Sequence, residues 1–395
     1  CNLDLFLTRP ARLRQLYAQR LAGHGAAVIE AAMGYYDGAA LTDAASAWQV
    51  ADTLGLPVLL VVRPGGASLT LAAQIRGLRA FRPDSHLAAI LLNECSPGYA
   101  ARLAPLLERE TGLPVIGCLP RLEEARLPSR HLGLYTAAEI DNLSGRLNAL
   151  ADALEANASL DRLLDLCRRP APEAAAEALP PVRAKIAVAR DAAFCFCYPE
   201  SLDALRAAGA ECVFFSPLAD AALPAAQGLY LPGGYPELYA GALSQNQPMR
   251  RAVAAAVQSG MPTVAECGGF LYLGQALADK EGKRWPMVGV LPGEGFAARG
   301  LVRFGYASLT AEEDSLLFRS GEAVPAHEFH HWDSTSPGTA LAAQKPDGRA
   351  WRCGFVSARL YAAFPHLYWA GRPELAARFA DAAAAYRKEK HHAAV

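Results

Sequence analysis

The most specific chemical signal in the sequence is a cysteine placed between a strand and a helix. In the segment TVAECGGFLYLG, an apolar run leads directly into Cys267, and Gly268, Gly269 and a second apolar run follow. A nucleophile on such a sharp strand-to-helix turn needs small neighbours, because the turn is tight and strained. The N-terminus of the following helix is expected to lower the pKa of the thiol. The pattern therefore predicts a nucleophilic cysteine rather than a structural one.

A second glycine pair fits the same chemistry. The segment GLYLPGGYPELY is typical of a strand that ends at Gly233 and Gly234. The backbone N–H groups of such a loop, together with the N–H of Gly268, can bind the oxyanion that forms when a thiolate attacks a carbonyl group. Taken alone, the loop is more typical of a plain strand-to-helix turn, so its interpretation depends on Cys267.

A cysteine nucleophile needs a histidine to take its proton. The second half of the chain offers His327, His330, His331 and His366. The first three lie in AHEFHHWD, whose composition resembles that of a metal site. However, this segment lacks a paired cysteine and lacks a helical histidine pair with a glutamate between, so the pattern disfavours a metal.

Apolar strands that alternate with helices must position these residues. This alternation predicts α/β architecture with two doubly wound, mostly parallel sheets. The expected helices span 69–81, 99–111 and 137–169, and the expected strands span 26–34, 56–62, 86–94, 113–120, 185–191, 211–217, 228–234 and 262–269. A Pro- and Ala-rich stretch at 168–184 indicates a linker between a first domain, 1–167, and a second, 185–386, with a basic tail at 387–395.

Composition narrows the class of protein. The chain has 395 residues, of which 52% are apolar and 19% charged, which is typical of a globular protein. A net charge of −1 provides no basic excess for a nucleic-acid partner. No uncharged apolar run is long enough to span a membrane. The nine cysteines are scattered and odd in number, which favours a reducing, cytoplasmic compartment. Cys195 and Cys197 have no second ligand pair nearby, so we interpret both as structural.

Several motifs occur in the order found in one known family. In the second half they are PGGYPE, AECGG, HEFHHWD and HLYW, and in the first half NLDLFL, VIEAAMGYYDG, ILLNE, GCLPR and LPSRHLGL. Through them, nearly the whole chain resembles the cobyrinate a,c-diamide synthase family. The resemblance implies a P-loop domain related to dethiobiotin synthetase, here at 1–167. It also implies a flavodoxin-like class I glutamine amidotransferase domain at 185–386.

The resemblance implies roles for residues of the second domain. The nucleophile of the family falls on Cys267, its activating histidine on His366, and its oxyanion hole on Gly233, Gly234 and Gly268. The sequence departs from the family at Tyr368, where a second histidine is usual, which leaves open what orients His366.

In the first domain, the resemblance places a Mg²⁺ ligand at Glu30 and an adenine contact at Asn93. It also places at Asp37 a catalytic residue that helps phosphorylate or position the substrate carboxylate. Mg²⁺ prefers such hard oxygen ligands and bridges nucleotide phosphates. Taken alone, each acid is more typical of a capping or solvated residue, so these assignments depend on the family order.

One family feature is absent. No Gly-rich phosphate loop that ends in Gly-Lys-Thr or Gly-Lys-Ser occurs in the sequence, and the family's next segment, with an aspartate that serves the metal, is also missing. Since NLDLFL follows both in the family, we expect the sequence to lack its true N-terminus, along with the first strand of the synthetase sheet. As written, the chain is expected to bind ATP poorly and to retain only glutaminase activity.

The resemblance implies a ligase that forms C–N bonds with glutamine as the nitrogen donor. Its substrates would be ATP, with Mg²⁺, L-glutamine and a cobyrinate-type corrinoid, whose a and c acetate groups are amidated in cobalamin biosynthesis. Three alternatives stay open: hydrogenobyrinate or nickel-sirohydrochlorin as the acceptor, a cobyric acid synthase, and a degenerate module that binds a corrinoid or a partner without catalysis. A homodimer also stays open.

Overall fold

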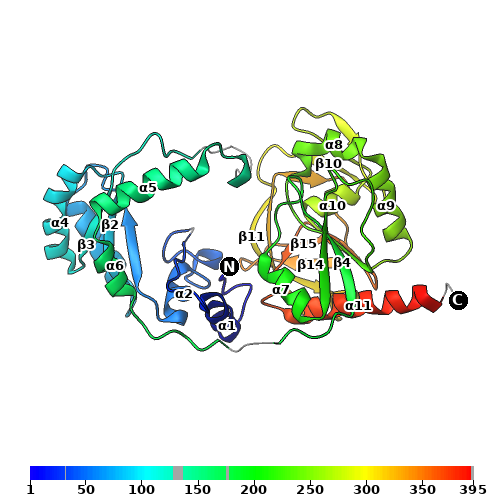
Figure 1. The fold of residues 1–395 in the computed structure, drawn as a ribbon, viewed down its shortest axis with the longest axis horizontal. Helices are drawn as coiled ribbons and strands as arrows, with labels where there is room; N and C mark the ends of the chain where they lie inside the picture. The colour runs from blue at the N-terminus through cyan, green and yellow to red at the C-terminus, as the bar shows by residue number, and fades with distance from the viewer. Residues whose placement is uncertain (32, 128–136, 175–177, 393–395) are drawn as a thin grey trace. The chain divides into compact units, whose positions relative to one another are not determined.

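The computed structural model describes residues 1–31, 33–127, 137–174 and 178–392 (Figure 1). Most of the motif LPSRHLGL therefore lies outside the described residues. The chain forms two compact units, of which one contains residues 21–173 and the other contains residues 1–20 together with 174–395. The sequence boundaries assign residues 1–20 to the first domain, whereas the structure groups them with the second. Every helix among the described residues falls short of the length and apolar character that a membrane crossing requires.

The first unit contains a parallel sheet in the order β1-β2-β3. Its strands are β1 (Val58–Val62), β2 (Leu87–Asn93) and β3 (Val115–Leu119). Its helices are α2 (Ala47–Leu54), α3 (Leu69–Ala80), α4 (Pro97–Thr111), α5 (Leu143–Asn157) and α6 (Leu160–Cys167). Helices α3 and α4 pack on one face of this sheet, and α5 and α6 pack on the other. Helices on both faces confirm the predicted doubly wound arrangement.

Local sequence explains how these helices begin and end. In α4, the Ser96 side chain accepts a hydrogen bond from the Tyr99 N–H, Pro97 occupies the first helical position, and Gly112 ends the helix in a left-handed conformation. Each residue is of the type that its position favours. Helix α4 is thereby fixed between β2 and β3, which it must connect.

The strand predicted at 26–34 is wrong. Residues 26–31 form neither helix nor strand and are exposed, and the Val28 side chain is 96% exposed. An apolar run becomes a strand only when a neighbouring strand satisfies its backbone hydrogen bonds. Among the described residues, β1 and β3 pair only with β2, so no strand adds to either edge of this sheet.

The second unit is built around a six-stranded sheet in the order β16-β17-β7-β6-β4-β5. All neighbours are parallel except β16 and β17. Its strands are β4 (Ala184–Ala189), β5 (Ala210–Phe215), β6 (Gly228–Leu231), β7 (Thr263–Glu266), β16 (Phe355–Ser357) and β17 (Leu360–Ala363). The four strands predicted between 185 and 269 are confirmed as β4 to β7.

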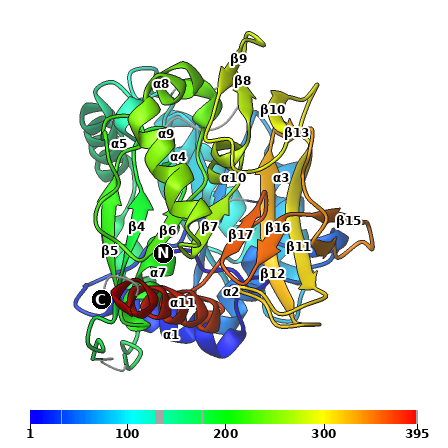
Figure 2. The same ribbon diagram turned by 90° about the vertical axis from the view of Figure 1, so that its right-hand side faces the viewer.

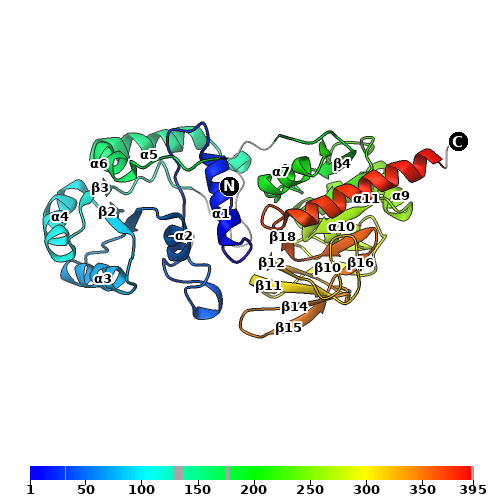
Figure 3. The ribbon, with the colours of Figure 1, turned by 90° about the horizontal axis from the view of Figure 1, so that it is seen from below.

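Helices cover both faces of this sheet (Figure 2). Helices α7 (Pro199–Ala207) and α11 (Pro373–His392) pack on one face, and α11 runs along β4 and β6 (Figure 3). Helices α8 (Ala240–Gln245), α9 (Gln247–Gln258) and α10 (Gly268–Leu273) pack on the other face. The α1 helix (Pro10–Leu21) also belongs to this unit, apart from its last residue.

Two further sheets, which the sequence pattern did not predict, complete the unit: a five-stranded antiparallel sheet and a four-stranded mixed sheet, in which β8 and β10 are parallel. One has the order β15-β14-β11-β12-β18, and the other has the order β13-β10-β8-β9. Their strands are β8 (Ala276–Ala278), β9 (Arg284–Pro286), β10 (Glu294–Ala297), β11 (Arg303–Ala311), β12 (Ala323–His330), β13 (Trp332–Ser334), β14 (Leu341–Gln344), β15 (Ala350–Cys353) and β18 (His366–Leu367). The second unit is therefore α/β with a mostly parallel main sheet, one added antiparallel sheet and one added mixed sheet.

Candidate active site

Cys267 lies at a sharp turn between β7 and α10. Its backbone has φ 48° and ψ −102°, a conformation that a residue with a side chain rarely adopts. The Cys267 N–H donates to the Ala363 carbonyl on β17, 2.8 Å away, which fixes the turn against the neighbouring strand. Strained backbone at a single reactive residue costs about 1–3 kcal/mol and persists only where the surrounding structure imposes it. The structure thus has the strand–turn–helix geometry expected for a nucleophile.

The two glycines after Cys267 are required by close packing. A β-carbon on Gly269 would stand 2.0 Å from the carbonyl oxygen of Leu231, at the end of β6. A β-carbon on Gly268 would stand 2.9 Å from the Pro236 ring and 3.1 Å from the backbone nitrogen of Gly234. The turn after Cys267 therefore lies directly against the loop that follows β6.

That loop also lies against His366. A β-carbon on Gly233 would stand 2.4 Å from the imidazole Cε1 of His366. Gly234 has φ +155°, and a β-carbon there would stand 2.1 Å from the Ala193 carbonyl oxygen. The Gly233 carbonyl accepts a hydrogen bond from the Phe196 N–H at 3.0 Å. The structure therefore brings together Cys267, the glycine loop and His366, as the sequence predicts.

His366 begins the short strand β18, which pairs with β12 so that His366 lies opposite His327. Its imidazole is buried and contacts the Phe196 ring edge-on, with 4.7 Å between the ring centroids. The His327 ring lies 5.7 Å away, also between centroids. The Nδ1 atom of His366 is buried and has no hydrogen-bond partner among the described residues.

A buried carboxylate lies next to this imidazole. Glu266, the last residue of β7, is 2% exposed. Its Oε1 accepts a hydrogen bond from the Leu367 N–H at 3.1 Å, and its Oε2 accepts one from the Tyr230 hydroxyl at 2.9 Å. The same Oε2 lies 4.0 Å from Nδ1 of His366. Burial raises the pKa of Glu266 to about 8, against the effect of the two hydrogen bonds.

The pKa values of Cys267 and His366 determine their protonation states, and the pKa of Cys267 differs from our expectation. Burial raises the pKa of the Cys267 thiol, and the carboxyl groups of Glu237 and Glu328 add to this effect. The nearby Gly268 N–H opposes the rise in the thiol pKa without reversing it. Burial also lowers the pKa of His366 well below its usual value. The expected lowering of the thiol pKa is therefore wrong for the chain as it stands, and both groups are neutral at neutral pH.

Tyr368, the residue that departs from the family pattern, does not contact His366 through its hydroxyl. That hydroxyl donates to the Asn2 carbonyl at 2.8 Å, and the Tyr368 ring packs edge-on against Tyr198. The same N-terminal segment is held by Tyr306, whose hydroxyl donates to Asp4 at 2.7 Å. Residues 2–7 therefore pack within the second unit, next to Tyr368 and Tyr306.

The histidine-rich segment AHEFHHWD occupies β12, the bend after it and the start of β13. His330 stacks on Phe364 with 4.0 Å between centroids, and its Nδ1 lies 2.6 Å from the Trp332 carbonyl oxygen. The buried Glu328 pairs with His330 and with Arg303, each 3.4 Å from Oε2. Among the described residues, no group of three or more His, Cys, Asp or Glu side chains is arranged to hold a metal ion.

The three residues of the first unit to which the resemblance gives a role lie in three different segments. Glu30 lies in the exposed segment that was predicted to be a strand. Asp37 is also exposed, in a turn closed by a hydrogen bond from its N–H to the Gly34 carbonyl. Asn93 is the half-buried last residue of β2. Their roles stay predictions.

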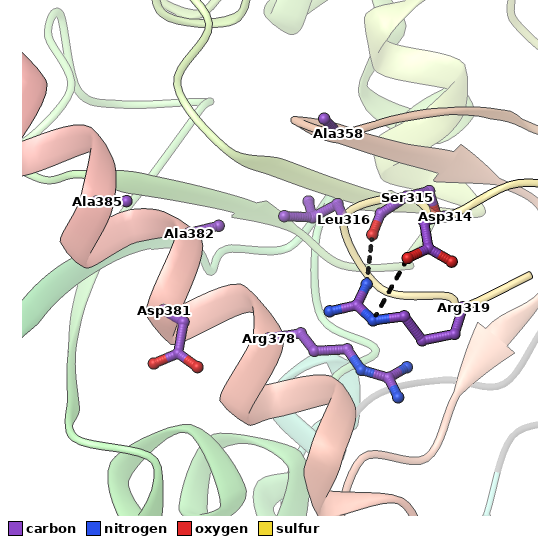
Figure 4. A pocket seen from close by; sticks show the side chains of 9 residues that line it. All are labelled: Asp314, Ser315, Leu316, Arg319, Ala358, Arg378, Asp381, Ala382 and Ala385. Atoms are coloured by element: carbon purple, nitrogen blue, oxygen red, sulfur yellow. Dashed lines mark hydrogen bonds and ion pairs between the residues drawn. The ribbon is translucent and has the colours of Figure 1, made fainter.

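A separate pocket of about 400 Å³ lies between α11 and the loop after β11 (Figure 4). Its cationic side chains are already paired, Arg378 with Glu322 and Arg319 with Asp314. It is lined by Asp314, Ser315, Leu316, Arg319, Ala358, Arg378, Asp381, Ala382 and Ala385. None of these residues belongs to the site around Cys267.

Sequence reasoning missed the acidic residues of the site, namely Glu237, Glu266 and Glu328. The signal for Glu266 was its position immediately before Cys267. The pairing of β18 with β12 places His366 opposite His327, and this pairing has no signature in the local sequence. In the folded chain, Nδ1 of His366 lies 4.0 Å from Oε2 of Glu266.

The fold and the site together define a class of protein, the glutamine amidotransferases. Residues 185–374 match the model of the CobB/CobQ-like glutamine amidotransferase domain. A solved structure, PurLQS from Thermotoga maritima, covers 51% of this chain and 98% of its own with a TM-score of 0.37 and 18% identity.

Relatives extend over almost the whole chain. The cobyrinate a,c-diamide synthase of Caldanaerobacter subterraneus subsp. tengcongensis is 35% identical, covering 98% of this chain and 87% of its own. The protein of the same name from Salmonella typhimurium is 36% identical, covering 95% of this chain and 84% of its own. The chain belongs to the cobyrinate a,c-diamide synthase family.

Proposed function

We propose that this protein takes nitrogen from glutamine and uses it to amidate the a and c acetate groups of cobyrinate. In this proposal Cys267 is the nucleophile, His366 is its base, and Gly233, Gly234 and Gly268 form the oxyanion hole. The observation that carries the proposal is the strained backbone of Cys267, with the Gly233 loop packed against its turn and His366 packed against that loop. Family membership supports the choice of a corrinoid as the acceptor.

The geometry supports a glutaminase step that begins from neutral groups. As Cys267 attacks the side-chain carbonyl of glutamine, its proton passes to His366, so no thiolate need exist beforehand. The carbonyl oxygen becomes an oxyanion, which the N–H groups of the glycine loop and of Gly268 would hold. His366 then donates this proton to the amide nitrogen, the C–N bond breaks and ammonia leaves, so that a thioester remains on Cys267. Water hydrolyses the thioester and releases glutamate.

Backbone geometry supports the oxyanion hole. The Gly268 N–H acts to lower the pKa of the Cys267 thiol, so this donor lies near the reacting atom. The backbone nitrogen of Gly234 lies 3.1 Å from the position that a Gly268 β-carbon would occupy. The two loops therefore bring Gly234 and Gly268 close together, which an oxyanion hole with one donor from each loop requires.

The described residues do not fit a Mg²⁺–ATP site. Glu30 and Asp37 are both exposed, no described cluster of acids is arranged for a metal, and the sequence has no Gly-Lys-Thr or Gly-Lys-Ser phosphate loop. ATP and Mg²⁺ are part of the proposal only through the family, and we derive no phosphoryl-transfer step on this chain. Glutaminase activity is the reaction that these residues support.

The test compares glutamine hydrolysis and amidation by the same 395-residue chain. We expect glutamate and ammonia to form from glutamine without ATP, and this activity to fall to background in Cys267→Ser. Amidation is then assayed with ATP, Mg²⁺ and each of three rings: cobyrinate, hydrogenobyrinate and nickel-sirohydrochlorin. Product from cobyrinate supports the corrinoid assignment, and product from another ring alone overturns it. Glutamine hydrolysis that persists in Cys267→Ser overturns the nucleophile.

A further inference from the structure

The imidazole of His366 has one ring nitrogen with no partner. A histidine that accepts a proton through one nitrogen works best when a hydrogen-bond acceptor holds the other nitrogen, because that acceptor fixes the tautomer and stabilises the imidazolium. In this protein Nδ1 of His366 is buried and makes no hydrogen bond to the described residues. Tyr368, at the position where the family pattern places a second histidine, turns its hydroxyl to the Asn2 carbonyl instead.

The acidic group closest to that nitrogen is Glu266. Its Oε2 lies 4.0 Å from Nδ1, and both side chains are at least 95% buried. From these positions we infer that Glu266 is the positioning residue of His366, accepting a hydrogen bond from Nδ1–H when the imidazole takes the Cys267 proton. The inference rests on the proposed glutaminase function and goes beyond it, by naming what orients the base.

The way Glu266 is held supports this role. Its Oε1 accepts from the N–H of Leu367, the residue next to His366, so the carboxyl group fixes the backbone that carries the imidazole. Its Oε2 accepts from the Tyr230 hydroxyl on β6, which holds the same oxygen that faces Nδ1. The remaining gap to Nδ1 is longer than a hydrogen bond by about an ångström. A positive charge on the imidazole would draw the two groups together.

Among the described residues, the other neighbours of His366 are less suited to accept this hydrogen bond. The Phe196 ring approaches His366 edge-on and offers no lone pair. His327 lies 5.7 Å away between centroids and, like His330, disfavours a positive charge on His366. Glu328 hydrogen-bonds to His330 and pairs with Arg303 instead. Glu266 is therefore the carboxyl group that faces Nδ1.

The ionisation of Glu266 predicts a pH dependence. The titratable groups that face it from the surrounding elements are Cys197, Tyr198, Tyr230, Cys267, Tyr361 and His366. Burial raises the pKa of Glu266 to about 8. Below that pH the carboxyl group of Glu266 carries a proton and would donate a hydrogen bond to Nδ1 of His366. The imidazole proton would then be on the other ring nitrogen, which is the one that must accept the Cys267 proton. Glutaminase turnover should therefore rise as Glu266 ionises.

The test uses the full chain with Glu266→Gln, which keeps an oxygen for the Leu367 N–H and removes the charge. We expect kcat for glutamine hydrolysis to fall about 10- to 100-fold, the range for losing an orienting partner, with little change in KM. We also expect the rise in kcat near pH 8 to disappear. Thr263→Val, on the same strand, is the control for the loss of a buried polar group in β7, and it should keep that rise.

A second measurement does not depend on activity. The ¹⁵N chemical shifts of the His366 ring should change near pH 8 in the unmodified chain and in Thr263→Val, and should lose that change in Glu266→Gln. An unaltered pH profile and unaltered ring shifts in Glu266→Gln would overturn the inference. If the unmodified chain hydrolyses no glutamine, the proposed function fails, while the ring shifts still decide whether Glu266 and His366 are coupled.

Discussion

Gly233 and His366 lie so close that a single β-carbon on the glycine would reach 2.4 Å from the imidazole Cε1. The two residues are 133 positions apart in the chain and come from different sheets, one after β6 and the other at the start of β18. This contact fixes the distance between the loop that would bind the oxyanion and the group that would take the proton. The position of the base thus depends on the absence of a side chain at Gly233.

Gly233→Ala should therefore impair glutamine hydrolysis by displacing His366. Misplacement of a catalytic group by about 1 Å costs about 100-fold in rate, and we expect a fall in kcat of that order. The measurement is steady-state glutaminase kinetics. Gly300→Ala is the matched control, because a β-carbon there meets no atom within 4 Å. A Gly233→Ala protein with unchanged kcat would contradict the proposed arrangement.

Gly269→Ala should destabilise the second unit rather than act on chemistry alone. The added carbon would stand 2.0 Å from the Leu231 carbonyl oxygen, and neither backbone segment can move without disturbing β6 or α10. Overpacking of this kind costs about 1–3 kcal/mol. Thermal unfolding, followed by circular dichroism, should show a melting temperature lower than that of Gly300→Ala. Equal melting temperatures would mean that the turn tolerates a β-carbon.

Glu266 should make stability depend on pH. Its pKa of about 8 is above that of a glutamate in an unfolded chain, so the folded protein binds the proton more tightly. Stability from this group is fully present below pH 4 and is lost as pH rises toward 8, with an upper bound on the order of 5 kcal/mol. Urea unfolding at pH 5 and pH 8 should show a larger loss for the unmodified chain than for Glu266→Gln. An equal loss in both proteins would contradict the raised pKa.

Tyr368→Phe should lower stability without changing glutamine hydrolysis. The lost hydroxyl donates to the Asn2 carbonyl and not to His366, so the cost should be that of one hydrogen bond, about 0.5–1.5 kcal/mol. Chemical denaturation measures the cost and glutaminase kinetics measures the activity. A large fall in kcat with stability unchanged would show that Tyr368 orients the base.

The sequence predicts the elements around Cys267 well, because each carries a local signal. Apolar runs that end in glycine pairs mark β6 and β7, and the turn residues at Gly233, Gly268 and Gly269 are the ones that tight packing requires. His366 could be selected from four histidines only through the family motif.

The parts that the sequence could not predict depend on long-range pairing. The antiparallel sheet places His366 opposite His327, and the partners in that sheet are far apart in the chain. The strand expected at 26–34 does not form for the same reason, since its apolar residues have no pairing strand among the described residues. The thiol pKa was mispredicted because local reasoning included the helix N-terminus but not the burial of Cys267 or its acidic neighbours.

The most direct test of the central claim is the site at which a glutamine-analogue electrophile modifies the full chain. Peptide mapping by mass spectrometry should place a single adduct on Cys267, and excess glutamine should protect it. The chain provides internal controls, because Cys195 is exposed and Cys353 is buried in the same unit. Modification of Cys267 with glutamine protection is the predicted result, and a protected adduct on Cys195 or Cys353 would contradict the assignment of the nucleophile.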